Sequence, residues 1–134
     1  MRTHLIPIFA ALGTLALAPL AQAAPETKPV SKGSGCFATN QWRGWSASPS
    51  GDALYLRVNN SDVYQVDLTP GSHARHTPGY FLVNNVRGSN WICSALDLNL
   101  AISDDLGFRQ PLIARSMRKL TPAEVAAIPP KHRP

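Results

Sequence analysis

The sequence predicts a mainly β fold, a small antiparallel barrel or sandwich of about five to six strands with a short C-terminal helix. Its 134 residues match the length of a single domain. Hydrophobic residues make up 44% of the chain and charged residues 16%, a balance typical of a folded domain. From Cys36 onward, short apolar alternations are separated by turn residues, which is the pattern of strands. These observations exclude a multidomain enzyme, a collagen-like repeat, a disulfide-dense toxin scaffold and a polytopic membrane protein.

Residues 1–23 are expected to be an export signal. Arg2 gives the segment a positive start, an apolar stretch follows from Leu5 to Leu20, and Ala21-Gln22-Ala23 fits the small-x-small pattern of a cleavage site. The alternative is a membrane anchor, but two prolines and a glycine interrupt a run shorter than the ~20 residues of a spanning helix. We therefore expect a periplasmic or secreted protein with no transmembrane segment after signal removal.

Cys36 and Cys93 are the only two cysteines. In an oxidising compartment an even number of cysteines usually forms disulfides, and two cysteines allow a single pairing. The predicted bridge closes a loop of about 57 residues and contributes roughly 4 kcal/mol in the chain-entropy model. Two alternatives stay open at this point: a pair of buried free thiols, and a zinc site completed by His73 and His76.

The elements of the predicted domain follow in chain order. Residues 24–35 are small, polar and rich in proline and glycine, so a flexible leader is expected before a single β-rich domain over 36–128. The clearest element is a hairpin, in which apolar residues alternate with polar ones on both sides of the Asn59-Asn60-Ser61 turn. Its inward-facing residues are expected to be Leu54, Leu56, Val58, Tyr64, Val66 and Leu68.

The later segments carry shorter patterns. Apolar alternations predict further strands over residues 80–83, 91–93, 96–102 and 112–118. Thr121-Pro122-Ala123-Glu124 is a capping box with proline at the first helical position, which predicts a short helix. Pro129-Pro130 ends the helix, and residues 129–134 are expected to form a frayed basic tail.

The order of several short motifs resembles a known family. These motifs are Gly35-Cys36-Phe37, Trp45, Asp62-Val63-Tyr64, Trp91-Ile92-Cys93 and Arg118-Lys119-Leu120-Thr121-Pro122-Ala123-Glu124. In this order they resemble the small exported Gram-negative bacterial proteins of the domain of unknown function 6491 family, over about residues 35–128. The resemblance implies export to the periplasm and a compact β-rich fold, and it implies no activity. Many such proteins carry a second cysteine pair, which this chain lacks at Gly71-Ser72-His73 and Arg109-Gln110-Pro111.

Few residues point to catalysis. His73 and His76 lie in a basic segment flanked by proline and glycine, so a helix that would place both on one face is not expected. No serine lies in a Gly-x-Ser-x-Gly motif, and the chain has no glycine-rich phosphate loop. A small hydrolase using His73 or His76 stays an alternative, but no catalytic residue, metal or cofactor is predicted. The arginines are spread along the chain, so nucleic-acid binding is not expected.

The tryptophans supply the candidate contact residues. Trp42 and Trp45 lie three positions apart, so in a regular strand they face opposite ways unless a bend at Gly44 intervenes. An exposed Trp42 or Trp45, with Arg43 between them, would suit a sugar or a protein partner. Alternatively, Trp45 and Trp91 pack around the disulfide as core residues.

The function that these observations favour is a non-catalytic binding or envelope-associated module. The net charge of +5 favours contact with an envelope protein or an anionic polymer. The alternatives are an inhibitor or immunity protein that blocks an envelope-acting enzyme, and the small hydrolase described above.

Overall fold

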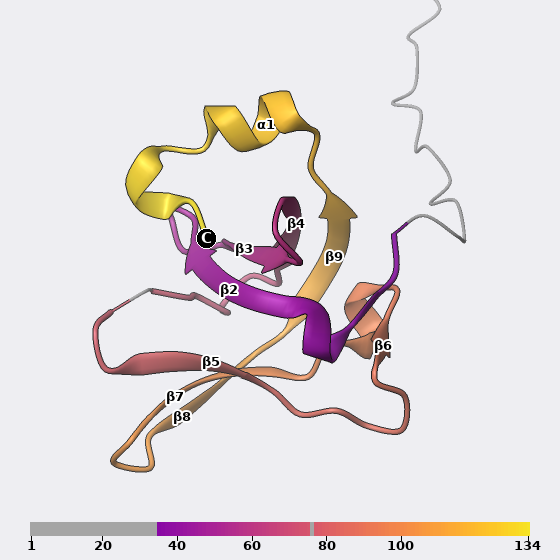
Figure 1. Cartoon of the computed structure of the whole chain (residues 1–134). Helices are drawn as coiled ribbons and strands as arrows, with labels where there is room; N and C mark the ends of the chain where they lie inside the picture. The colour runs from indigo at the N-terminus through magenta and orange to yellow at the C-terminus, as the bar shows by residue number, and fades with distance from the viewer. Residues whose placement is uncertain (1–34, 76) are drawn as a thin grey trace, which may run out of the picture.

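The computed structural model describes residues 35–75 and 77–134. The export signal expected over 1–23, nearly all of the leader over 24–35, and His76 lie outside these residues. Within them the chain forms nine strands in three antiparallel sheets and one short α-helix (Figure 1). The mainly β prediction is therefore confirmed, while the expected number of strands is too low. No described helix has the length and apolar character that crossing a membrane requires.

The three sheets differ in size. The largest has the order β2 (Trp42–Ala47), β3 (Ala53–Val58), β4 (Asp62–Leu68) and β9 (Ala114–Lys119). The second has the order β5 (Tyr80–Asn84), β7 (Leu100–Asp104) and β8 (Arg109–Leu112). The third pairs β1 (Phe37–Ala38) with β6 (Trp91–Ile92). The helix α1 (Pro122–Ala127) follows β9, and 3₁₀ turns lie at Thr39–Gln41, Ala95–Asp97 and Pro130–His132.

The strands β3 and β4 form the predicted hairpin. Asn59 has a φ of 54° in the turn, a left-handed conformation that asparagine tolerates better than most residues. The register pairs Leu54 with Val66 and Leu56 with Tyr64, and all four side chains are buried. One face of the hairpin therefore contributes to the core, as the alternation predicted.

The main core draws on all three sheets, which makes the described residues a single packed unit. Its largest fully buried side chains are Phe37, Leu54, Leu56, Val58, Val66, Ile92 and Leu100. A smaller cluster lies on the opposite face of β4, where Val63 packs with Leu120 and Ile128 from the C-terminal segment. The C-terminal segment thus covers part of the hairpin face that would otherwise meet water.

The strand expected over 96–102 is wrong in its first half. Ala95–Asp97 form a 3₁₀ turn, Leu96 is 94% exposed, and β7 begins only at Leu100. The Asp97 carboxylate accepts hydrogen bonds from the backbone N–H groups of Cys93 and Ser94, at 2.9 and 2.8 Å. These local bonds close the turn in place of strand pairing, and they also lower the pKa of Asp97.

The last strand, expected over 112–118, divides at Ile113. The Ile113 N–H donates to Ser72 Oγ at 3.1 Å, and its carbonyl accepts from the Thr69 N–H at 2.9 Å. Because Ile113 bonds to this turn and not to a strand, β8 pairs with β7 while β9 pairs with β4. A nearly continuous stretch of chain therefore passes from the second sheet into the largest one (Figure 1).

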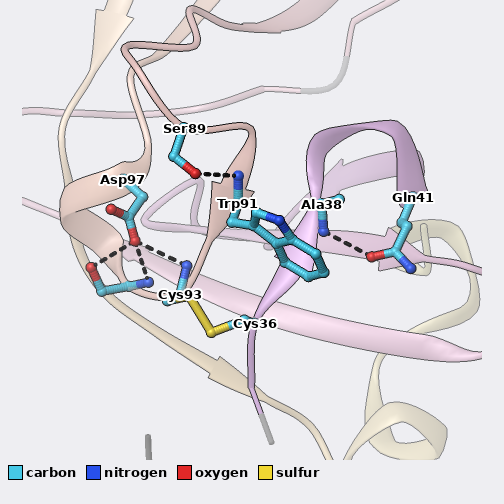
Figure 2. Close-up of a disulfide and its surroundings, with 8 residues drawn as sticks. Cys36, Ala38, Gln41, Ser89, Trp91, Cys93 and Asp97 are labelled. Carbon is cyan, nitrogen blue, oxygen red and sulfur yellow. Dashed lines mark hydrogen bonds between the residues drawn. A yellow bond between two sulfur atoms is a disulfide. The ribbon is translucent and has the colours of Figure 1, made fainter. Parts of the chain in front are cut away.

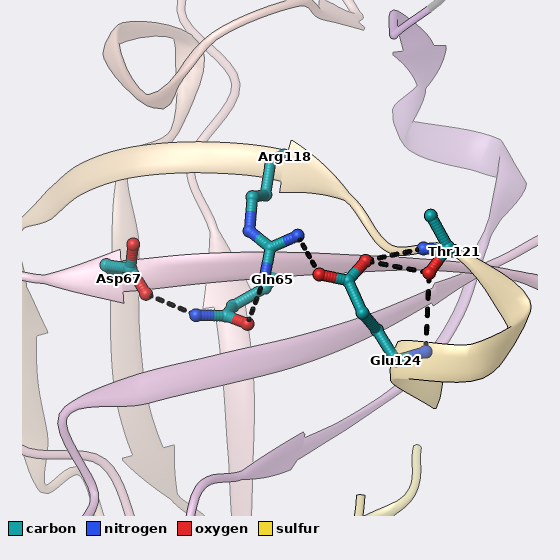
Figure 3. A network of polar contacts seen from close by, with 5 residues as sticks. All are labelled: Gln65, Asp67, Arg118, Thr121 and Glu124. Atoms are coloured by element: carbon teal, nitrogen blue, oxygen red, sulfur yellow. Dashed lines mark hydrogen bonds and ion pairs between the residues drawn. The ribbon is translucent and has the colours of Figure 1, made fainter. Parts of the chain in front are cut away.

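The predicted helix begins with the predicted capping box. Thr121 Oγ1 accepts a hydrogen bond from the Glu124 N–H, and Glu124 Oε2 accepts one from the Thr121 N–H at 2.8 Å. Arg118 on β9 donates to Glu124 Oε1 at 2.7 Å and also reaches Gln65 on β4 (Figure 3). The cap therefore ties the start of α1 to the largest sheet.

The expectation of a frayed tail over 129–134 is wrong. The backbone carbonyl of His132 accepts a hydrogen bond from Ser46 Oγ, and His132 Nδ1 lies 2.8 Å from the Ala47 carbonyl on β2. Arg133 donates to the carbonyls of Ala126 and Ile128, at 2.6 and 2.8 Å. Helix C-termini leave carbonyl groups without partners, so an arginine just beyond α1 has acceptors within reach and holds the tail against the fold.

The cap predicts a pH dependence of stability. The Thr121 N–H, then Arg118 and then the Thr121 hydroxyl hold the pKa of Glu124 at about 2 in the folded chain, against an ordinary 4.5. Because the folded pKa is the lower one, the stabilisation is complete above about pH 4.5 and is lost as pH falls towards about 2. We expect wild type to melt at a higher temperature than Glu124→Gln at neutral pH, and this difference to shrink as pH falls from about 4.5 towards about 2.

A charge-matched variant controls for the change in net charge. Asp105→Asn removes one negative charge from the turn between β7 and β8, away from the cap. Thermal unfolding of the three proteins at pH values from 7 down to 2 gives the comparison. A wild-type advantage over Glu124→Gln that stays constant through the acid range would contradict the assignment of this cap.

Candidate functional site

An open groove of about 430 Å³ lies between β2 and β5, which are edge strands of two different sheets. Its lining residues are Thr39, Trp42, Arg43, Gly44, Trp45, Phe81, Leu82, Asn84 and Val86. The three contact residues expected from the sequence, Trp42, Arg43 and Trp45, all line it. The second wall of the groove comes from β5 and the residues after it, about 40 positions further along the chain.

A β-bulge places both tryptophans on the same side of β2. The pairing of β2 with β3 shifts its register between Trp42 and Gly44, so Trp42 lies opposite Val58 and Trp45 opposite Leu56. Val58 and Leu56 face the core, and both tryptophans are half-buried against it. One extra residue in a strand reverses the direction of every later side chain, and this is the bend near Gly44 that the spacing required.

The bulge also fixes the ring of Trp42 at the N-terminal end of β2. Trp42 Nε1 donates to the Gly44 carbonyl at 2.9 Å, which holds the indole ring along the bulge. A Cβ at Gly44 would lie 3.4 Å from Nη2 of Arg57, so the Arg57 guanidinium group lies over this glycine. Arg43 is exposed and is the only charged side chain that lines the groove among the described residues. The groove therefore has a positive rim and no acid in its wall.

The β5 wall adds exposed apolar groups and an unpaired amide. Phe81 is 43% exposed and Val86 48% exposed. Asn84 Oδ1 accepts a hydrogen bond from the Asn99 N–H at 2.9 Å, whereas Asn84 Nδ2 is buried and has no hydrogen-bond partner within the described parts of the chain. A buried donor without an acceptor is unfavourable, and this nitrogen has almost no accessible surface, so it is a local cost of the fold and not an exposed ligand contact.

Neither cysteine of the disulfide lines the groove. Cys36 and Cys93 are bonded, as the even cysteine count predicted, and the bond joins β1 to the end of β6 (Figure 2). Trp45 packs against the main core, but Trp91 is 53% exposed. The expectation that Trp91 fills a core around the bridge is therefore wrong, because the two-residue strands β1 and β6 leave too little structure to cover an indole.

A second, polar pocket of about 440 Å³ contains His73. It also contains Ser48, Ser50 and Asp52. The Asp52 carboxylate accepts from Ser50 Oγ at 2.5 Å and Ser48 Oγ at 2.8 Å, and these bonds, the one from Ser50 first, lower the pKa of Asp52. A catalytic triad needs the imidazole between hydroxyl and carboxylate. Here the hydroxyls bond directly to the carboxylate, and no hydrogen bond joins the His73 ring to Ser48, Ser50 or Asp52.

Sequence reasoning found one wall of the groove and missed the other. The tryptophans and Arg43 stand out because large aromatic side chains beside a cation are typical of contact surfaces. Phe81 lies in the short apolar run expected as a strand over 80–83, whereas Asn84 and Val86 lie in the polar stretch after it, and only the folded chain brings these residues opposite β2. Comparison of this chain with family models, with curated proteins and with solved structures finds no match.

Proposed function

We propose that this protein is an exported, non-catalytic binding module that holds its ligand in the groove between β2 and β5. The observation that carries the proposal is the β-bulge, because it places Trp42 and Trp45 together at the groove beside Arg43. Exposed Phe81 and Val86 complete a groove that combines apolar groups with one cationic side chain. Such a mixture is typical of binding sites, where a few polar groups orient a ligand held by apolar contact.

Export is part of the proposal. The apolar leader with its Ala21-Gln22-Ala23 motif supports it, and a Cys36–Cys93 disulfide suits an oxidising compartment. Membership of the domain of unknown function 6491 family is proposed on the order of the sequence motifs alone. An envelope-associated role follows from export together with the positive net charge, which is +5 for the whole chain and +4 once signal removal takes Arg2 away, and which favours anionic partners.

We also propose that the two larger sheets act as one incomplete barrel. Only Ile113 separates β8 from β9, and the sheets share one core. Following the pairings then gives the order β2-β3-β4-β9, continued through Ile113 as β8-β7-β5. The gap in this order lies between β2 and β5, where the groove is.

Paired capture experiments test the proposed site. Wild type, Arg43→Glu and Arg109→Glu are immobilised and exposed to an envelope extract, and bound proteins and glycans are identified by mass spectrometry. Arg109 is an exposed residue of β8 outside the groove, so its variant changes net charge equally. We expect at least one species that wild type and Arg109→Glu retain, and that Arg43→Glu retains about tenfold less, because like charge then meets an anionic ligand.

The outcomes separate the functions considered. Equal retention by all three proteins would remove Arg43 and the groove from the function. Retention of one envelope enzyme, with loss of that enzyme's activity on binding, would identify the inhibitor alternative. Retention of an anionic polymer would identify an envelope-anchoring module.

A further inference from the structure

We propose that β5 is a docking edge for an extended, acidic polypeptide segment, which pairs with β5 as an added strand and directs an acidic side chain to Arg43. This inference rests on the proposed function and names the ligand class of the same groove. It begins from the outer strands of the two larger sheets. Each outer strand has one edge without a strand partner, and such an edge is a template for another chain unless it is protected.

Three of the four edges carry protection. On β9, Arg118 and Lys119 place charges along the strand, and the Ala95–Asp97 turn lies against it. On β8, Pro111 removes a backbone donor. On β2, the bulge breaks the regular strand, and His132 Nδ1 lies within hydrogen-bond distance of the Ala47 carbonyl. Charges, proline, bulges and covering segments are the devices that prevent strand addition.

The fourth edge, that of β5, has none of these devices in the part of the chain that the structure describes. Its sequence, Tyr-Phe-Leu-Val-Asn, contains no charge and no proline, and its pairing with β7 is regular over all five residues. The side chains of Tyr80 and Phe81 are exposed. Among the described residues, no segment forms a backbone hydrogen bond with β5 across this edge except at Tyr80, whose N–H donates to Thr77.

The backbone groups available for pairing can be named. The Asn85 N–H donates to the Asn99 carbonyl, so in this antiparallel pair odd-numbered residues bond towards β7. The N–H and C=O groups of Leu82 and Asn84 therefore face away from β7, towards the groove and β2. These groups match the alternate groups of an added strand, which is how strand addition gains affinity.

The side chains around this edge specify the chemistry of the segment. Arg43 is exposed at the groove, Arg57 lies over Gly44 beside it, and no aspartate or glutamate within residues 35–75 and 77–134 lines the groove. An acidic side chain on the added strand would therefore meet positive charge.

A polypeptide explains more of these features than the other occupants. An anionic glycan would contact the aromatic rings and Arg43, but it has no regularly spaced backbone groups that would pair with the N–H and C=O groups of Leu82 and Asn84. A second copy pairing through its own β5 would add no acid to the groove, because Tyr80–Asn84 contains none. An acidic extended segment suits both the edge and the charge.

The test selects peptides on the disulfide-bonded protein. The probe is a library of capped peptides of about six residues, the length that spans β5, with aspartate or glutamate at one end and β-branched residues elsewhere. We expect selected peptides to bind wild type and Arg109→Glu alike, and to bind Arg43→Glu about tenfold more weakly. Failure to select any peptide would overturn the inference.

Backbone methylation then decides whether the peptide binds as a strand. In an added strand only alternate N–H groups face β5, so N-methylation of one alternating set should weaken binding about tenfold or more, while the other set stays within about threefold. Leu82→Pro should weaken binding in the same way, since it removes an N–H that points away from β7. Leu82→Ala removes the same groove-lining side chain but keeps that N–H, so the difference in binding between the two variants isolates the backbone hydrogen bond. Equal effects of both methylated sets would contradict strand addition, whether or not Leu82→Pro folds.

Two further arms separate this inference from the proposed function. If an oligouronate binds and depends on Arg43, while no peptide binds, the groove keeps its function and the polypeptide is wrong. If sedimentation shows a dimer that Leu82→Pro disrupts and no peptide binds, a second copy is the occupant and the inference is likewise overturned. If Arg43→Glu changes the binding of no peptide, glycan or envelope component, the proposed function itself fails.

Discussion

Removing the disulfide is expected to lower the free energy of unfolding by about 4 kcal/mol. The change is the double variant Cys36→Ala/Cys93→Ala, which opens a loop whose ends are 57 positions apart in sequence. In the chain-entropy model, a bridge of this span stabilises the fold by restricting the unfolded chain. Since domains of this size have typical stabilities of about 5–15 kcal/mol, the loss removes a large share of the total. Urea unfolding of both proteins measures the change.

The reduced wild type serves as the matched control. Both cysteines are exposed, so a reductant has access to the sulfur atoms without global unfolding. Reduced wild type and the double variant should therefore unfold at nearly the same urea concentration, well below that of the oxidised protein. A difference of less than about 1 kcal/mol between oxidised and reduced protein would show that the bridge adds little to this fold.

The parts of the fold that the sequence predicted correctly depend on neighbours in the chain. The β3–β4 hairpin follows from alternation on both sides of a turn with Asn59, which can adopt a positive φ. The start of α1 follows from Thr121 and Glu124, whose reciprocal hydrogen bonds span three residues. In both cases the interaction that fixes the element lies inside the window from which the prediction is made.

The errors arise where a distant or competing hydrogen bond decides the structure. Leu96 continues an alternating pattern, yet the Asp97 carboxylate closes a turn and leaves Leu96 in solvent. The tail is basic and short, yet His132 meets β2, more than 80 positions earlier in the chain. At Asp97 a local hydrogen bond competes with strand pairing, whereas the tail finds its partner far away in the sequence. Neither bond follows from the alternation or the charge of the segment.

The candidate site likewise has one part that the sequence predicted and another that it did not. Trp42, Arg43 and Trp45 were identifiable because they are neighbours in sequence, and the spacing of the tryptophans made a bend at Gly44 the condition for a common face. The bulge meets that condition. Neither the groove nor the unprotected edge of β5 was foreseeable, because both depend on which strands end up without partners. Sheet order is set by the whole fold and not by any segment.

The second large effect is expected at Phe37, which anchors the N-terminal strand. Phe37 is 1% exposed, pairs with Ile92 and lies with its ring centroid 4.8 Å from that of Tyr64 on β4. It therefore joins the small β1–β6 sheet to the hairpin. Phe37→Ala should lower the free energy of unfolding by about 3–5 kcal/mol, since it removes a buried ring and leaves a cavity. Urea unfolding under oxidising conditions provides the measurement.

Phe37→Leu is the informative comparison, because it keeps much of the apolar volume and should cost only about 1 kcal/mol. Phe37 directly follows Cys36, so the Phe37→Ala variant shows how much of β1 the disulfide alone holds in place. With the disulfide intact, β1 stays tethered to β6 even when the ring is gone. Phe37→Ala should therefore expose the amides of β1 and β6 to hydrogen exchange while the β3–β4 hairpin stays protected. Loss of protection across the whole chain to the same degree would instead mean that β1 folds as part of one cooperative unit, with the ring and the bridge acting on the same transition.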